Sequence, residues 1–211
     1  MYAKVFFPKS ESIDQQKPAR TADELQKMQN LLNQKRIELI FGNYKVDVLF
    51  QENNIRVSNL NSNGVMRTCA LVDFVLPVPD WLKATHEKIY AGASIGQAIK
   101  EDGFELSKEP VYFGITELPE IARKNMETNE NSAAVHIYQL KVSSNPQSSE
   151  SFLYCTIVEL HSPLYLTLGD LRALYPQDTL KYNTVTDSVQ QHLNTLSQID
   201  ELIPSSSNEH K

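Results

Sequence analysis

Residues 152–160 read Phe-Leu-Tyr-Cys-Thr-Ile-Val-Glu-Leu, the most apolar strand-like stretch of this 211-residue chain. Successive side chains of an extended chain point to opposite sides, so this stretch presents bulky residues on both of them. Such a pattern is typical of a strand that is covered by other elements rather than left at an edge. We therefore expect residues 152–160 to form a central strand that anchors the core.

Period-2 alternation of side chains predicts further strands earlier in the chain. Two of them are joined across residues 61–64, where the pair Asn63-Gly64 favours a tight hairpin turn. Strands that follow one another through tight turns pair antiparallel. The strands predicted before the central one are residues 44–50, 55–60, 65–78, 110–114 and 133–143.

Helix signals flank and separate these strands. Thr21 and Glu24 have the spacing of a capping box, and Gly42-Asn43 supplies a stop, so one helix is predicted between them. We expect Asp80 and Ser94 to cap the next two helices. The helices predicted after the first are residues 81–90, a short helix ending at Gly103, residues 168–174 and residues 185–202.

Together these elements predict an α+β fold with a central antiparallel sheet and helices packed on it. A chain of this length suffices for one well-packed core and is short for two. We expect a polar N-terminal segment (1–20), an α+β domain (21–165), a C-terminal helical extension (166–203) and a disordered tail (204–211).

Composition and charge exclude several classes of protein. The net charge of −6 argues against nucleic-acid binding, which depends on Lys and Arg side chains. The apolar run at residues 5–7 is too short for a signal peptide or a membrane span. Cys69 and Cys155 each lie in an apolar strand-like run, which suits buried, reduced thiols. We expect a cytoplasmic protein.

The central strand and the residues after it resemble the chorismate pyruvate-lyase family. Residues 156–165 are similar to that family's final strand, which also carries a Glu a few residues before a Ser-Pro-Leu-Tyr ending. Residues 94–99 resemble its Pro-Leu-Gly turn and short helix, and residues 107–114 occupy the place of its following Arg-led strand. Ile55-Arg56 resembles the strand that bears the family's substrate Arg. The resemblance covers residues 28–165 and implies a chorismate lyase-like fold.

Two segments depart from the family's pattern. Its first-helix motif, Ser-Met/Leu-Thr-x-Arg, reads Leu-Asn-Gln-Lys-Arg at residues 32–36 and retains only Arg36. Its Gly-Arg pair before the returning strand reads Val72-Asp73. We expect an Asp in place of a cation to repel a dianionic substrate, so the resemblance supports the fold more than the activity.

The resemblance implies elimination of pyruvate from chorismate to give 4-hydroxybenzoate, the opening step of ubiquinone biosynthesis, without a cofactor. Arg56 would anchor the substrate carboxylate and Glu159 would protonate the departing group. Glu159 shares a strand face with Cys155 and Ile157, apolar surroundings that favour a protonated acid. Substrate-binding roles would fall to Ile95, Arg36 and Lys108.

The alternative is a non-catalytic binding or adaptor protein on the same fold, such as a secretion-system or regulatory subunit. It would hold a small carboxylated ring ligand, a peptide or a partner helix. The predicted C-terminal helix carries an apolar stripe and would be either a lid or a docking face. An effector-binding domain of a transcription regulator ranks third, because no DNA-reading module is attached.

The sequence disfavours two other types of site. Residues 92–96 match the Gly-x-Ser-x-Gly pattern of serine hydrolases, but an amphipathic helix precedes them where a buried strand is required. The five histidines show no His-x-x-x-His or Cys-paired spacing, so no metal site is expected.

Overall fold

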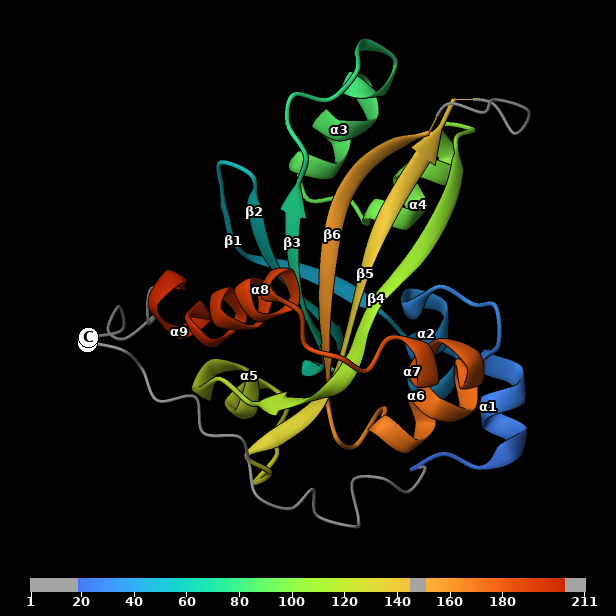
Figure 1. The fold of residues 1–211 in the computed structure, drawn as a ribbon, viewed down its shortest axis with the longest axis vertical. Coiled ribbons are helices and arrows are strands. Elements are labelled where there is room, and N and C mark those ends of the chain that lie inside the picture. The colour runs from blue at the N-terminus through green and yellow to red at the C-terminus, as the bar shows by residue number, and fades with distance from the viewer. Residues whose placement is uncertain (1–18, 145–150, 204–211) are drawn as a thin grey trace.

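The computed structural model describes residues 19–144 and 151–203. One six-stranded antiparallel sheet dominates them, in the order β1-β2-β3-β6-β5-β4 (Figure 1). Its strands are β1 (Lys45–Glu52), β2 (Ile55–Ser62), β3 (Val65–Phe74), β4 (Glu105–Glu117), β5 (Ser132–Ser143) and β6 (Phe152–His161). The predicted α+β class is confirmed, and the quoted stretch is β6, which lies between β3 and β5 at the centre of the sheet.

Side chains alternate between the two faces of the sheet. Face A carries Val72, Tyr138 and Ile157, and face B carries Leu71, Ile137 and Val158. Both faces are buried, because separate apolar clusters form on each of them. A strand with bulky residues on both sides is therefore covered on both, as the sequence of β6 indicates.

Helices from three parts of the chain cover face A. The first two, α1 (Ala22–Met28) and α2 (Asn33–Phe41), share an apolar cluster with α6 (Leu168–Leu174). A short 3-10 turn, η2 (Asp80–Leu82), leads into α3 (Lys83–Tyr90), which packs with α4 (Ile95–Glu101) toward the other end of that face. Next to α6 lies α7 (Pro176–Lys181), and Figure 1 shows α1, α2, α6 and α7 grouped beside the sheet.

Face B is covered by three helices, α5 (Glu120–Asn125), α8 (Asp187–Ser197) and α9 (Ile199–Leu202). Val189 and Leu196 of α8 and Ile199 of α9 are buried against strand residues such as Leu71 and Val158. The predicted helix at residues 185–202 is thus two helices, and its apolar stripe packs on the sheet. A C-terminal helical segment after β6 is confirmed.

Several predicted boundaries are wrong. The first helix breaks into α1 and α2, because Asn30 adopts a left-handed conformation (φ 60°) that no helix interior accepts. Strand β3 ends at Phe74 rather than residue 78, ahead of Pro77, which has no N–H to donate to a ladder. Asp80 does not cap α3 but pairs with Lys83. Ser94 occupies the cap position of α4 without a capping hydrogen bond.

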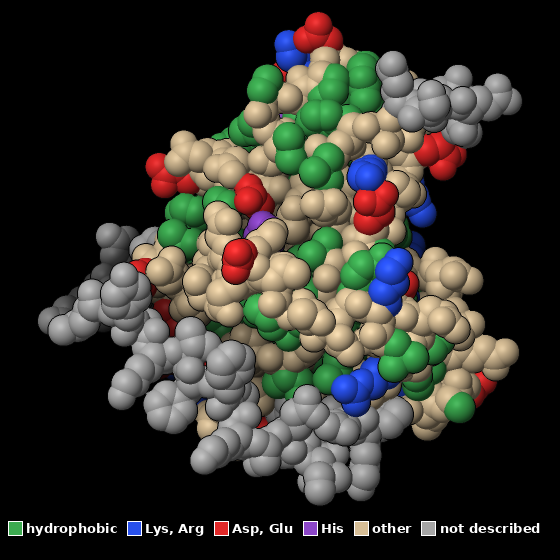
Figure 2. All heavy atoms as spheres, viewed as in Figure 1, with side chains coloured by type: hydrophobic (Ala, Val, Ile, Leu, Met, Phe, Trp, Pro, Cys, Tyr) green, Lys and Arg blue, Asp and Glu red, His purple; other side chains and the backbone are tan. Residues whose placement is uncertain are grey.

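The surface carries interspersed charges. Acidic and basic side chains are scattered among apolar ones on the face drawn in Figure 2 rather than gathered into a basic patch. Within the described ranges, no helix combines the length and apolar character needed to cross a bilayer. Cys69 and Cys155 are both buried free thiols, as predicted.

One buried carboxylate joins the first described residues to the start of α6. Asp170, in the first turn of α6, is fully buried and accepts from the backbone N–H and hydroxyl of Thr167 in a capping box. It also accepts from the backbone N–H groups of Ala19 (3.1 Å) and Arg20 (2.9 Å). The start of α1 is therefore fixed to the start of α6.

Replacement of this carboxylate tests its contribution to stability. We expect Asp170→Ala to lower the free energy of unfolding by about 3 kcal/mol, because it removes a helix cap and two charge-assisted hydrogen bonds. Asp187→Ala, at an exposed position in the first turn of α8, is the control and should change stability by less than about 0.5 kcal/mol. Urea unfolding measures the stability of both variants. Equal losses of stability would contradict the stabilising role of Asp170.

Candidate functional site

A pocket opens between face A of the sheet and the N-terminal ends of α2 and α4. The space within it that the centre of a water-sized sphere can reach is about 90 Å³, so the pocket is narrow. Apolar side chains form most of its wall, and a few polar groups converge on it. The polar lining residues are Asn33, Gln34, Tyr44, Arg56, Ser58, Ser94, Lys108, Tyr138 and Glu159.

Arg56 of β2 lies in the wall of this pocket with only 2% of its surface exposed. Its Nε donates to Ser58 Oγ (2.8 Å), and Nη1 donates to the carbonyls of Ile89 (2.7 Å) and Ala93 (3.2 Å). Those contacts use three of its five N–H groups. Both hydrogens of Nη2 have no acceptor among the described residues, and no described carboxylate pairs with the charge.

Ile95 and Lys108 line the same pocket, as the resemblance implies. Lys108 of β4 keeps exposed surface, but that surface borders this pocket and a neighbouring cavity. Its ammonium lies 4.2 Å from the centre of the Tyr138 ring. Protein packed around the ammonium lowers the pKa of Lys108, and the Glu159 carboxylate opposes that change.

Arg36 does not join this group. Its Nε donates to the carbonyl of Met28 (2.9 Å), and its guanidinium lies over the Tyr175 ring, 5.2 Å from the centre. It lines the neighbouring cavity, which shares Leu32, Leu106 and Lys108 with the pocket. The structure therefore brings together Arg56, Ile95, Lys108 and Glu159, and leaves Arg36 beside them.

Asp73 also lies away from the pocket. It pairs in register with Thr156 on β6, which puts its side chain on face B, and it accepts a hydrogen bond from Asn54 Nδ2 (2.5 Å). Val72, one residue earlier, lines the pocket instead. The expected repulsion between Asp73 and a dianionic ligand is therefore wrong, because neighbouring strand residues point to opposite faces.

Glu159 lies on β6 at the inner end of the pocket and is 6% exposed. Its surroundings are more polar than its apolar strand neighbours suggest. Oε1 accepts from Asn33 Nδ2 (3.1 Å) and from the Tyr138 hydroxyl (3.2 Å). Oε2 lies 3.9 Å from His161 Nε2. Two donors therefore fix one carboxylate oxygen and leave the other for different chemistry.

Asn33 organises this end of the pocket. Its Nδ2 also donates to Thr68 Oγ1 (3.1 Å), and its Oδ1 accepts from the Tyr165 hydroxyl (2.9 Å). All four partners, Asn33, Thr68, Glu159 and Tyr165, are buried. In the sequence Asn33 is only a departure from the family motif, and its position as the first residue of α2, after a break that the sequence did not predict, gave no signal of this role.

Tyr44 contributes a further polar group to the wall. Burial raises the pKa of Tyr44 to about 12, so its hydroxyl is a neutral donor at physiological pH. The pocket thus offers the neutral hydroxyls of Tyr44, Ser58 and Ser94 and the two cations Arg56 and Lys108. Glu159 is the acidic residue among its lining side chains.

No protein-family model matches this chain, and no curated protein matches it. Among solved structures, it is similar to the C-terminal domain of YurK from Bacillus subtilis subsp. subtilis strain 168. That similarity has a TM-score of 0.30 and 15% sequence identity, and covers 56% of this chain and 86% of the other. At this level the similarity supports no statement about the site, and the chorismate lyase resemblance remains a prediction.

Removal of Asn33 tests the network around Glu159. We expect Asn33→Ala to lower the free energy of unfolding by about 2 to 3 kcal/mol, because Glu159 and the Tyr165 hydroxyl each lose a partner while buried. Lys35→Ala, an exposed position on the same helix, is the matched control, with a change below about 0.5 kcal/mol. Chemical denaturation measures both, and a loss no larger than that of Lys35→Ala would refute the network's importance.

Proposed function

We propose that this protein binds a small compound that carries a carboxylate on a largely apolar ring, in the pocket lined by Arg56 and Glu159. The observation that carries this proposal is that Nη2 of Arg56 has no acceptor among the described residues. A buried guanidinium without an anionic partner is costly, and a carboxylate is the group that its planar donors match best.

The rest of the pocket suits such a ligand. Lys108 supplies a second positive charge at the junction of the two cavities. Apolar side chains from both the sheet and α4, such as Leu60, Ile95 and Ile157, supply surfaces against which a ring packs. A mostly apolar cavity with few oriented polar groups is the usual form of a small-molecule site.

Elimination of pyruvate from chorismate is the second candidate, and it is favoured by the position of Glu159 in the same pocket as Arg56. In that reaction the C–O bond of the enolpyruvyl ether breaks, the ring loses a hydrogen and becomes aromatic, and the leaving group gains a proton as pyruvate. With Oε1 held by Asn33 and Tyr138, Oε2 is the oxygen of Glu159 available for that proton transfer.

The adaptor alternative draws less support. One of its supports is the C-terminal helix as a docking face, and Val189 and Leu196 of α8 are buried against face B. That face lies opposite the pocket, so α8 is not a lid over it. Binding of a small ligand in the pocket therefore accounts for more of the observed side chains.

Calorimetric titration with 4-hydroxybenzoate and 4-hydroxybenzamide tests the proposed binding, since the two share a ring and differ in charge. We expect Arg56→Met to weaken binding of the acid about 30-fold, equivalent to about 2 kcal/mol, and to affect the amide little. Arg123→Met on α5, beside face B, should bind both like wild type. Equal affinity of the wild type for acid and amide would exclude carboxylate recognition by Arg56.

Incubation with chorismate tests the lyase. If the reaction occurs, 4-hydroxybenzoate and pyruvate should accumulate in equal amounts, and Glu159→Gln should lower kcat at least about 100-fold because it removes the proton donor. Glu109→Gln, whose exposed carboxylate pairs with Lys141, serves as the control and should retain full activity. Absence of turnover by the wild type would eliminate the lyase candidate. Ligand binding would then be decided by the calorimetric titration alone.

A further inference from the structure

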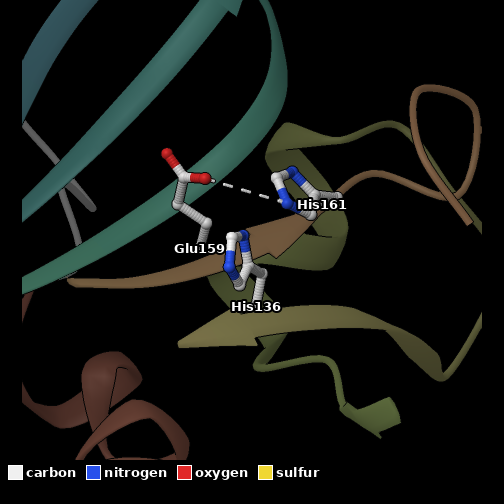
Figure 3. Close-up of side chains that lie close together, drawn as sticks. All are labelled: His136, Glu159 and His161. Carbon is white, nitrogen blue, oxygen red and sulfur yellow. Dashed lines mark ion pairs between the residues drawn. The ribbon is translucent and has the colours of Figure 1, made fainter. Parts of the chain in front are cut away.

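Three potential metal-binding side chains converge beneath the pocket. His136 lies on β5, directly opposite Glu159 on β6 in the strand register. His161 follows two residues after Glu159 on the same face of β6. Figure 3 shows the two imidazoles and the carboxylate gathered around one space, and one donor atom from each lies within 4.8 Å of the others.

Both imidazoles carry an unused nitrogen. His136 is 4% exposed and His161 is 1% exposed, and Nε2 of each has no hydrogen-bond partner among the described residues. Buried polar atoms in folded proteins are nearly always paired, so two unpaired nitrogens beside one carboxylate require an explanation. An ion coordinated by both nitrogens and the carboxylate would supply that explanation.

We infer that His136, His161 and Glu159 bind a divalent transition-metal ion of the zinc type. Two imidazoles and one carboxylate form the donor set of many zinc and iron(II) centres, whereas magnesium and calcium prefer oxygen ligands. This inference goes beyond the proposed ligand binding and does not require it. A metal ion on Oε2 of Glu159 would exclude the lyase candidate, in which the same oxygen carries the proton. It also departs from the sequence-based expectation of no metal site.

The surrounding residues suit this role. The other ring nitrogen of His161, Nδ1, lies 3.1 Å from Thr68 Oγ1, which can accept its proton when Nε2 binds the ion. The His136 ring stacks on Phe113, with centres 4.2 Å apart, which fixes its plane. Glu159 Oε1 is held by Asn33 and Tyr138, so Oε2 is directed to the histidines. Each candidate ligand is thus oriented by a neighbour.

Electrostatics has two opposing effects here. Burial lowers the pKa of His161 to about 4 and that of His136 below its ordinary value, so both rings are neutral, the form that coordinates metal. Lys108 and Arg36 add to the lowering of both pKa values. The same cations repel a divalent ion, and Glu159 supplies the compensating charge within the cluster. Loss of the carboxylate should therefore be as damaging as loss of a histidine.

Equilibrium dialysis of the full-length protein, first treated with EDTA, tests this site with zinc alone, cobalt(II) alone and magnesium alone. We expect one zinc or one cobalt per chain, no magnesium, and cobalt absorption bands typical of mixed nitrogen and oxygen ligation. His136→Gln, His161→Gln and Glu159→Gln should each weaken zinc binding more than about 100-fold, since loss of even an outer-shell partner costs about 10- to 100-fold. His192→Gln, on α8, is the matched control and should bind like wild type.

Folding of each variant is checked by circular dichroism, and cobalt spectra of the wild type provide evidence that needs no variant. Failure of the wild type to bind zinc or cobalt would overturn the inference and assign the unpaired nitrogens to ordered water. Binding retained by the three variants would overturn it as well. Benzoate-type ligands are absent from these experiments. Failure to bind metal would therefore not bear on the proposed ligand binding, which the calorimetric titration tests separately.

Discussion

The register of β6 against its two neighbours is the constraint on which the site depends. Pairing with β3 puts Thr68 opposite His161 and Ala70 opposite Glu159, and pairing with β5 puts His136 opposite Glu159. A slip of one residue would turn Glu159 and His161 toward α8 and the apolar cluster of face B. The slip is opposed because Glu159 and His161 would be buried among apolar side chains without the partners they have on face A. Packing of the core thus determines the chemistry at the end of the strand.

Burial of so many polar groups in one place is tolerated because neighbouring elements supply partners for most of them. An unpaired buried polar group costs about 1 to 3 kcal/mol, more if it is charged. Asn33 at the start of α2 serves Glu159, Thr68 and Tyr165 together, and Tyr165 comes from the segment that follows β6. The two segments are 132 residues apart in the chain. The Ser-Pro-Leu-Tyr ending is therefore a support for the site as well as a terminus of the strand.

Strong local signals in the sequence predicted most of the fold. The capping box at Thr21, the Asn63-Gly64 turn and the apolar run of β6 each depend on residues close in the chain, and the structure confirms all three. The break at Asn30 was missed, because it serves the docking of Asn33 on distant strands. Strand pairing also brings together residues that are distant in the chain, so spacing in the sequence could not reveal the cluster of His136 and His161. Only the grouping of Arg56, Ile95, Lys108 and Glu159 followed from the resemblance.

The central position of β6 has a consequence for how this chain acquires its structure. During synthesis the β1-β2-β3 meander and the β4-β5 hairpin are complete before β6, yet β6 lies between them and forms the ladders that join them. Until residues 152–161 are available, the two parts have no shared strand ladder, and β3 and β5 each present an open edge. Open edges are templates for association between chains, and long-range pairing slows folding. Protection of these edges while the ribosome finishes the chain is therefore a requirement that this topology imposes on the cell.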